Sequence, residues 1–371
     1  MSMRHARSRP RLRRERGVAV VTALLLTTLA ISIVASLFWQ QQVQVRSMEN
    51  QRLNLQTRWI LRGALDYATL ILDSRRYDNG GNLFTSQDQV WATPLAETRL
   101  DQYIERERVE GENFNATLSG NVTDACSRYN LRNLASGHRV PDEGQIEVFQ
   151  RLLTNLQLDP ALAKRIAGFV ALSVPAEAVP PAAPGAGGAG AGGAGGEGVD
   201  AGGAGGADGA GGAGGNANPN ANSILASAGV VGTPMKLLQV DDLLAVPGVT
   251  PAVVERLRPF VIVLPAVTPV NINTAPAEVL AAVLHSSLSD ANTLIVRRKQ
   301  APLRDLNALQ NMGSLNHGAM APGSADVKSS YFLVDSRIRL DRAALDAEAL
   351  VYSPLTLVAG GGTQVMWVRQ N

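Results

Sequence analysis

Charged residues are absent from one long stretch of this chain, and cysteine is almost absent from all of it. Cys126 is the single cysteine in 371 residues, which excludes an intramolecular disulfide. We expect its side chain to be a small, buried, apolar group. Residues 18–45 contain no Asp, Glu, Lys or Arg. At about 1.5 Å per residue, an apolar helix over residues 18–39 can cross a hydrocarbon core about 30 Å thick. The sequence therefore predicts a membrane-spanning helix near the N-terminus.

Patterns typical of catalytic sites are also missing. There is no Gly-x-Ser-x-Gly or Walker motif. The histidines show no helical metal-ligand spacing, and the carboxylates that could pair are scattered, as solvated groups usually are. The histidines are His5, His138, His285 and His317, and the possible carboxylate pairs are Asp73 with Asp78 and Asp335 with Asp341. We predict that the protein is not an enzyme and has no catalytic residues, cofactor or metal site.

The residues before the apolar stretch are strongly basic. Seven arginines and one glutamate lie within residues 1–17, so the positive-inside rule predicts a cytoplasmic leader and a remainder on the other side of the membrane. Without this leader the chain has 27 basic and 31 acidic residues, and its formal net charge falls from +2 to −4. A mildly acidic protein is not typical of an electrostatic nucleic-acid binder.

Three interpretations of the basic-to-apolar junction compete. A cleaved secretory signal has an apolar core of about 7–15 residues and a small-x-small cleavage site, whereas this longer core ends at Phe38 and Trp39. A plain signal anchor fits both the length and the charge. The third interpretation depends on Gly17. A basic leader, a glycine and a hydrophobic helix resemble the prepilin class, in which a membrane peptidase cuts after the glycine and the new first residue is N-methylated.

Helical periodicity continues beyond the membrane. No proline occurs between the leader and Pro94, so one helix is predicted from Val18 to about Arg75. Residues 113–122 alternate between apolar and polar and predict a half-buried strand. The expected architecture is α+β, with the long helix packed on an antiparallel sheet.

Short helices are predicted next, followed by a return to strands. The helices cover 143–156, 160–172, 240–246, 251–257, 275–284, 289–298 and 303–309, and the strands cover 331–340, about 350–358 and 363–369. This order indicates a helical insertion within the sheet domain. Eighteen of the 36 glycines lie within residues 185–215, so the Gly/Ala-rich segment 180–222 is predicted to be disordered.

The segment 270–280 supports two interpretations. In the first, Asn273 or Thr274 caps an ordinary helix, with Glu278 near the positive end of its dipole. In the second, Asn-Ile-Asn-Thr-Ala followed by Glu-Val-Leu resembles helix-hairpin-helix DNA-binding proteins, some of which are membrane-anchored. Those proteins bind phosphate through a Gly-x-Gly hairpin, which neither 285–288 nor 246–251 retains. A membrane-anchored DNA-binding protein is therefore the alternative function.

Taken together, five stretches resemble the K-type minor pseudopilin family of the Gram-negative type II secretion system (general secretion pathway protein K). They are residues 16–21, 122–131, 246–251, 270–284 and 331–334. The resemblance implies a pilin-like fold with a large all-α insertion domain. It also implies cleavage between Gly17 and Val18, with N-methylation of Val18. The implied divisions are a leader at 1–17, a transmembrane part at 18–39, a pilin domain at 40–130 and 326–371, and the insertion at 131–325.

The same resemblance implies a role in secretion. The protein would lie at the tip of a periplasmic pseudopilus and initiate or cap its assembly, which exports folded proteins across the outer membrane. Its implied partners are the I-type and J-type minor pseudopilins, other pseudopilins, the prepilin peptidase and the inner-membrane assembly platform, with no nucleic acid. It would cross the inner membrane once, with the N-terminus cytoplasmic and the C-terminal domain periplasmic.

At two places the sequence departs from family patterns, and this affects which family properties can be expected here. Most pilins have Glu five residues into the mature chain, where it compensates a neighbour's N-terminal amine. Here that position is Thr22, and the K-type family is similar in lacking this Glu. A tip subunit has no neighbour above it whose amine needs a partner. The family's insertion domain has also been associated with calcium. Here the matching region is followed by a run whose only carboxylates are Glu197, Asp200 and Asp208, short of the roughly six oxygen ligands calcium requires. We assign no calcium site.

Overall fold

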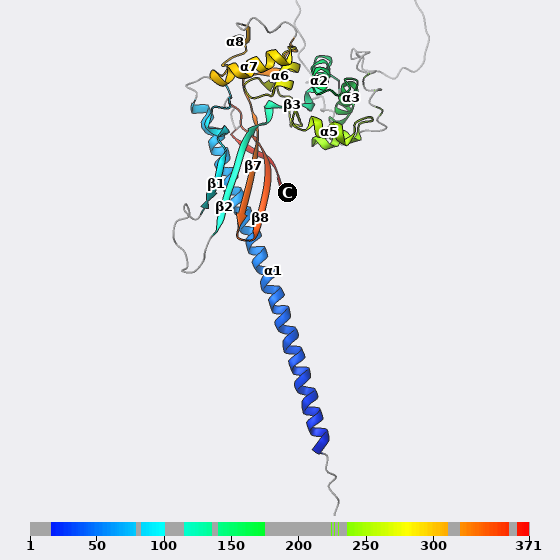
Figure 1. The fold of residues 1–371 in the computed structure, drawn as a ribbon, viewed down its shortest axis with the longest axis vertical. Coiled ribbons are helices and arrows are strands. Elements are labelled where there is room, and N and C mark those ends of the chain that lie inside the picture. Colours follow the sequence, from blue (N-terminus) through cyan, green and yellow to red (C-terminus); the bar gives the residue numbers. More distant parts are fainter. Residues whose placement is uncertain are drawn as a thin grey trace, which may run out of the picture.

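The computed structural model describes residues 16–78, 83–100, 115–135, 140–174, 236–310, 320–355 and 362–370, together with residues 224, 226 and 229. A single long helix, α1 (Arg16–Asp78), forms a stem whose upper part lies beside a sheet, with shorter helices above that sheet (Figure 1). The predicted disordered segment 180–222 lies outside the described residues. The α+β prediction and the continuous helix are both confirmed.

Helix α1 changes its surroundings along its length. At about 1.5 Å per residue, its 63 residues span roughly 95 Å. The side chains of residues 18–39 are all exposed. Farther along, one face is buried against the sheet at successive spacings of four, three and four residues, through Leu61, Leu65, Ala68 and Leu72. The helical period in the sequence thus places one apolar stripe on the sheet.

The sheet is antiparallel and has the strand order β1-β2-β7-β8-β9. Its strands are β1 (Leu95–Arg99), β2 (Ala116–Asp124), β7 (Tyr331–Leu340), β8 (Ala343–Tyr352) and β9 (Gln364–Gln370). Phe332, Val334 and Ile338 of β7 lie in the core shared with α1. Trp91, in the short 3₁₀ helix η1 (Val90–Ala92), meets the Phe332 ring edge-on, with centroids 5.1 Å apart.

Three of the four strand predictions correspond to strands of the sheet, one is misplaced, and the edge strand β1 was not predicted. The strands expected at 113–122, 331–340 and 363–369 correspond to β2, β7 and β9. The strand expected at about 350–358 is misplaced, because β8 begins at Ala343 and ends at Tyr352. The chain turns directly after β7 through Asp341, whose φ of 50° is left-handed. The residues that follow have only modest β-propensity, and they form strand β8 because they pair with β7.

Two glycines in this domain should respond oppositely to substitution. A Cβ on Gly120 of β2 would lie 2.5 Å from the backbone oxygen of Asp335, whereas a Cβ on Gly63 of α1 would meet nothing within 4 Å. Gly120→Ala should therefore lower the free energy of unfolding by about 2–3 kcal/mol, and Gly63→Ala should raise it by about 1 kcal/mol. Urea unfolding of the full chain in detergent micelles measures both. A stabilised Gly120→Ala variant would contradict this register.

The helical module lies between β2 and β7 in the chain. Its helices are α2 (Glu143–Asn155), α3 (Leu162–Ser173), α5 (Pro251–Leu257), α6 (Ala277–Val283), α7 (Leu288–Gln300) and α8 (Asn307–Gln310), with 3₁₀ helices η3 (Ala125–Ser127), η4 (Leu131–Leu134) and η5 (Val240–Ala245). Each predicted helix has a counterpart, although 240–246 is 3₁₀ and 303–309 is reduced to α8. One apolar core, which includes Phe149, Ile166 and Leu280, joins them.

Two short parallel ladders, which the sequence did not predict, accompany these helices. Strand β3 (Tyr129–Asn130) pairs with β4 (Val261–Ile262), and β5 (Val270–Asn271) pairs with β6 (Ala325–Asp326). Each is two residues long and carries no periodic signal. They connect the module to the segments immediately after β2 and before β7.

Candidate functional site

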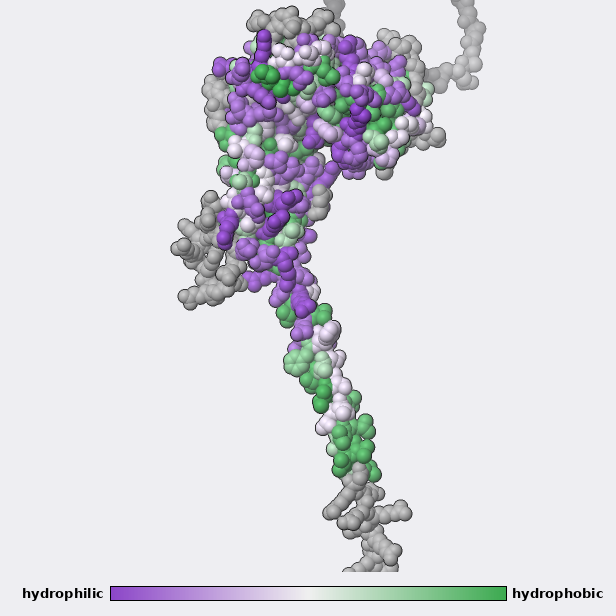
Figure 2. All heavy atoms as spheres, viewed as in Figure 1, coloured by the Kyte–Doolittle hydropathy of each residue, from purple (hydrophilic) through white to green (hydrophobic). Residues whose placement is uncertain are grey.

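The predicted processing residues lie at the beginning of α1. Gly17 is in its first turn, and the Val18 side chain is 64% exposed. The Thr22 hydroxyl donates to the Ala19 carbonyl at 3.0 Å, so its polar group is satisfied within the helix. This end of α1 is covered by hydrophobic side chains (Figure 2). The described residues contain one helix, 18–76, that is long and apolar enough to cross a membrane.

A second apolar face of α1 remains uncovered above the membrane part. Met48, Leu55, Trp59 and Leu70 are all more than half exposed. They follow one another at seven, four and eleven residues, which are helical repeats, so they lie on roughly one side of α1. The sheet covers the face that carries Leu72 instead. The upper half of α1 therefore has one face for the sheet and another free for a neighbouring helix.

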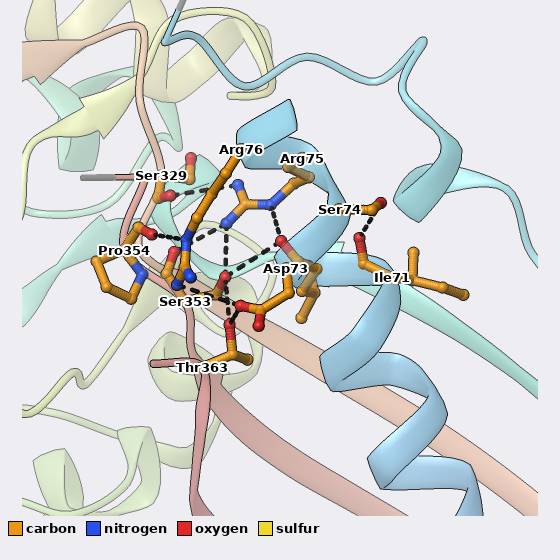
Figure 3. A network of polar contacts seen from close by, with 10 residues as sticks. Ile71, Asp73, Ser74, Arg75, Arg76, Ser329, Ser353, Pro354 and Thr363 are labelled. Atoms are coloured by element: carbon orange, nitrogen blue, oxygen red, sulfur yellow. Dashed lines mark hydrogen bonds and ion pairs between the residues drawn. The ribbon is translucent and has the colours of Figure 1, made fainter. Parts of the chain in front are cut away.

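The end of α1 is attached to the sheet by a buried arginine (Figure 3). The Arg75 guanidinium donates from Nη2 to the Ser353 carbonyl at 2.8 Å and its hydroxyl at 3.0 Å, and from Nη1 to the Thr85 hydroxyl at 3.2 Å. Its carbon Cζ lies 4.1 Å from the centroid of the Phe332 ring. Arg75 is only 2% exposed, so these contacts replace its hydration.

A neighbouring set of contacts fixes the start of β9 to the same helix end (Figure 3). Arg76 donates from Nε to the Pro354 carbonyl at 2.9 Å and pairs with Asp73 at 3.2 Å. The Thr363 hydroxyl donates to Asp73 and also contacts the Ser353 hydroxyl. Asp73 thus pairs within this attachment, whereas the Asp78 side chain lies outside the described residues.

A buried carboxylate, Asp124, sits where the sheet meets the helical module. It is 5% exposed and lies at the end of β2. Its oxygen Oδ2 accepts hydrogen bonds from Asn271 at 3.0 Å, Thr274 at 2.5 Å and Ser329 at 2.6 Å, and Oδ1 accepts from the backbone of Cys126 at 2.8 Å. Burial raises the pKa of Asp124, and the four donors oppose that shift.

Arg75 and Asp124 belong to one continuous network. The Thr85 hydroxyl accepts a hydrogen bond from Arg75, and the Thr85 carbonyl accepts one from Asn271. The Ser329 carbonyl accepts from Arg75, and the Ser329 hydroxyl donates to Asp124. We call Arg75, Thr85, Ser329, Asp124 and Asn271 the buried polar network. It connects α1, the sheet and the helical module.

The proposed capping roles of Asn273 and Thr274 were wrong. Pro276 is the N-cap of α6 and its side chain makes no cap hydrogen bond. Asn273 instead bonds the backbone of Leu303 in both directions, at 2.8 and 2.9 Å, and Thr274 binds Asp124. Both side chains are occupied in joining the module to its surroundings.

The cysteine and the one described histidine are largely enclosed by the protein. Cys126 is 2% exposed, and burial raises the pKa of its thiol to about 12. The His285 Nδ1 lies 3.9 Å from Glu147, and burial lowers the pKa of His285. The remaining histidines, His5, His138 and His317, lie outside the described residues, as do Glu197, Asp200 and Asp208. Within the described ranges there is no group of three His, Cys, Asp or Glu residues able to hold a metal.

Comparison with known proteins agrees with these observations. A family model described as "Type II secretion system (T2SS), protein K" matches residues 270–328. The chain is 23% identical over 356 residues to type II secretion system protein K of Pectobacterium carotovorum subsp. carotovorum, covering 91% of this chain and 93% of the relative. It is 24% identical over 362 residues to the Pseudomonas aeruginosa protein of the same name, covering 95% and 92%. The chain is therefore similar over most of its length to protein K of type II secretion systems.

A solved structure gives the corresponding fold. A chain of the GspK-GspI-GspJ complex from enterotoxigenic Escherichia coli aligns with a TM-score of 0.51 at 14% identity, covering 87% of this chain and 99% of that chain. The similarity to the two K proteins supports a minor pseudopilin of type II secretion, and the described residues include one N-terminal helix long and apolar enough to cross a membrane. The 270–328 match includes Asn271 of the buried polar network and Asn273.

Proposed function

We propose that this pseudopilin occupies the tip of the type II secretion pseudopilus, where it initiates or caps assembly for export of folded proteins across the outer membrane. The full-length similarity to two K proteins carries the proposal. The two-faced upper half of α1 supports it, because one face holds the protein's own sheet while Met48, Leu55 and Trp59 are free to pack on neighbouring helices. The proposed neighbours are the I-type and J-type minor pseudopilins and other pseudopilins.

A secretion assay tests this role. In the source organism, deletion of the gene should retain type II exoproteins inside the cell, and re-expression of the full chain should restore them to the medium. Affinity capture of the chain from detergent-solubilised membranes should recover the I-type and J-type subunits. Normal secretion by the deletion strain would refute the proposal.

We also propose that the prepilin peptidase cuts between Gly17 and Val18 and that Val18 is then N-methylated. The junction fits that chemistry because glycine places no side chain at the cut, directly before the charge-free stretch 18–45. The seven arginines of the leader support a cytoplasmic N-terminus and a periplasmic C-terminal domain in the inner membrane. Thr22, which keeps its hydroxyl bonded inside α1, needs no charged partner.

Mass spectrometry of the N-terminal peptide tests this processing. The chain isolated from membranes should begin at N-methylated Val18, and Gly17→Leu should retain residues 1–17. Gly63→Ala, which changes another glycine of the same helix, should be processed normally. An intact leader on the unmodified chain would exclude the prepilin pathway and leave the plain signal anchor.

The alternative function, DNA binding through residues 270–284, gains no support from the side chains there. Asn271, Asn273 and Thr274 are all engaged in internal hydrogen bonds. The connection from α6 to α7 runs through His285, with φ of 52°, instead of a glycine pair. Salt-sensitive micromolar binding of DNA to the full chain in a filter assay would reverse this choice.

A further inference from the structure

A groove lies between the edge of the sheet and the helical module. It has a volume of about 370 Å³, and its lining includes the apolar residues Leu237, Leu264 and Trp367 and the cations Arg132, Lys236 and Arg369. Leu237 and Leu264 are buried, at 6% and 2% exposure, so the floor of the groove is a fixed part of the core surface. We call these six residues the basic groove.

One side of the basic groove is formed by β9, which ends the sheet. Among the described residues no strand pairs with the outer edge of β9, so part of its backbone N–H and C=O groups has no ladder partner. Val365, Met366 and Val368 are each about 40% exposed on this strand. Proteins usually protect such an edge with lysine, proline or a covering segment. Within residues 364–370 there is neither proline nor lysine.

The charges of the basic groove are unbalanced. Arg369 stacks on Trp367 with its Cζ 4.3 Å from the ring centroid and donates to the Leu238 carbonyl at 3.4 Å. In the described part of the chain none of Arg132, Lys236 and Arg369 takes part in an ion pair. Asp242, six residues after Lys236, accepts from the backbone N–H groups of Leu238 and Gln239. Three cations thus border an apolar floor in a protein whose formal charge without its leader is negative.

We propose that the basic groove and the edge of β9 bind an extended, acidic–apolar segment of another protein by strand addition. The backbone of that segment pairs with β9. Side chains alternate between the two faces of a strand, so every second residue of the segment enters the groove, where carboxylates meet Arg132, Lys236 and Arg369, and apolar groups meet Leu264 and Trp367. Main-chain pairing supplies affinity, and the alternate side chains supply specificity. This inference does not depend on the tip role.

Fluorescence anisotropy with labelled octapeptides tests the proposal on the full chain in non-ionic detergent. A peptide with Glu and Val taking turns at every second position and Ser between them (Ser-Glu-Ser-Val-Ser-Glu-Ser-Val) should bind about ten-fold or more tightly than the same peptide with Lys in place of Glu. Backbone N-methylation of the acidic peptide, which removes its N–H donors, should weaken binding about ten-fold. The double variant Arg132→Glu, Lys236→Glu should reverse the preference, while Arg337→Glu, an exposed change outside the groove, should not.

Several outcomes would overturn the proposal. Equal binding of acidic and basic peptides would remove the charge argument, and full binding of the N-methylated peptide would remove strand addition. Binding of anionic phospholipid vesicles that competes with the peptide would assign the groove to a lipid surface. Self-association of the chain, abolished by the groove double variant, would assign it to a second copy.

Discussion

Replacement of Arg75 by alanine should lower the free energy of unfolding by about 3–5 kcal/mol. The change removes donors from Ser353 and Thr85 and from the Ser329 carbonyl, all of which are buried. Buried acceptors that lose their donors cost about 1–3 kcal/mol each, less where a water enters the space. The cation–π contact with Phe332, at 4.1 Å, is lost as well.

Two variants separate charge from geometry at Arg75. Arg75→Lys keeps the charge but presents one ammonium in place of a planar fork, so it should recover only part of the loss. Arg62→Ala, which removes an exposed arginine of the same helix 6.0 Å from the Trp59 ring, should change stability by less than about 0.5 kcal/mol. Urea unfolding in detergent micelles gives these values. Equal effects of Arg75→Ala and Arg62→Ala would show that the buried contacts contribute nothing.

A local measurement shows where the Arg75 contacts act. The Ser353 carbonyl and hydroxyl receive Arg75, and the Ser353 hydroxyl also donates to the Leu72 carbonyl at 3.3 Å. Hydrogen exchange of the segment that follows β8 should therefore rise in Arg75→Ala more than exchange in α2, which belongs to a separate core. The attachment holds the stem and the sheet as one body, which a membrane-anchored subunit needs if its head is to follow its helix.

Elements with a long repeat could be predicted from the sequence, and short or paired elements could not. Helix α1 has a charge-free span and then an apolar stripe, and β7 begins with an apolar run and then alternates, so both were found. Strand β8 was misplaced because its first six residues include Ala343, Asp346 and Glu348, whose extended conformation comes from pairing with β7. The ladders of β3 and β5 depend wholly on partners more than fifty residues away.

The polar residues of the candidate site were harder to predict. Arg75 follows Leu72 by three residues and so continues the buried stripe of α1, a signal that the sequence did contain. Asp124 had no comparable signal, because its four donors come from three separate segments that meet only in the folded chain. Thr274 was expected at a helix cap, since Asn and Thr favour caps, but a buried carboxylate competes for its hydroxyl. The roles of Gly17, Val18 and Thr22 remain predictions.

The second large effect is expected at Asp124, where alanine should also cost about 3–5 kcal/mol. Asn271, Thr274 and Ser329 would lose a shared acceptor, and Arg75 would lose the nearest carboxylate of the buried polar network. Asp346→Ala is the matched control, because Asp346 forms an exposed ion pair with Arg337 at 2.9 Å, worth about 0–1 kcal/mol. Since Asn271 and Thr274 belong to the module, the module should loosen from the sheet, which hydrogen exchange at residues 270–275 would detect.

Asp124 and Arg75 should also be energetically coupled. The two side chains are joined through Thr85 and Ser329, so the double variant Arg75→Ala, Asp124→Ala should be more stable than the sum of the single effects by about 1–3 kcal/mol. Removing either side chain takes away an electrostatic attraction from the other, which stays buried, whereas removing both does not. Strict additivity would mean that the helix attachment and the module attachment act independently.

The pH dependence of stability gives a further test of Asp124. Burial raises its pKa in the folded protein above the ordinary value of 3.8, so between these values the native state binds more protons than the unfolded chain. Its contribution to stability is therefore greatest at low pH and falls as pH rises through this window. Asp124→Asn cannot titrate, so its unfolding free energy should fall less between pH 4 and the folded pKa than that of the unmodified chain. Parallel curves for the two proteins would show that the donors of Asn271, Thr274 and Ser329 fully offset the cost of burial.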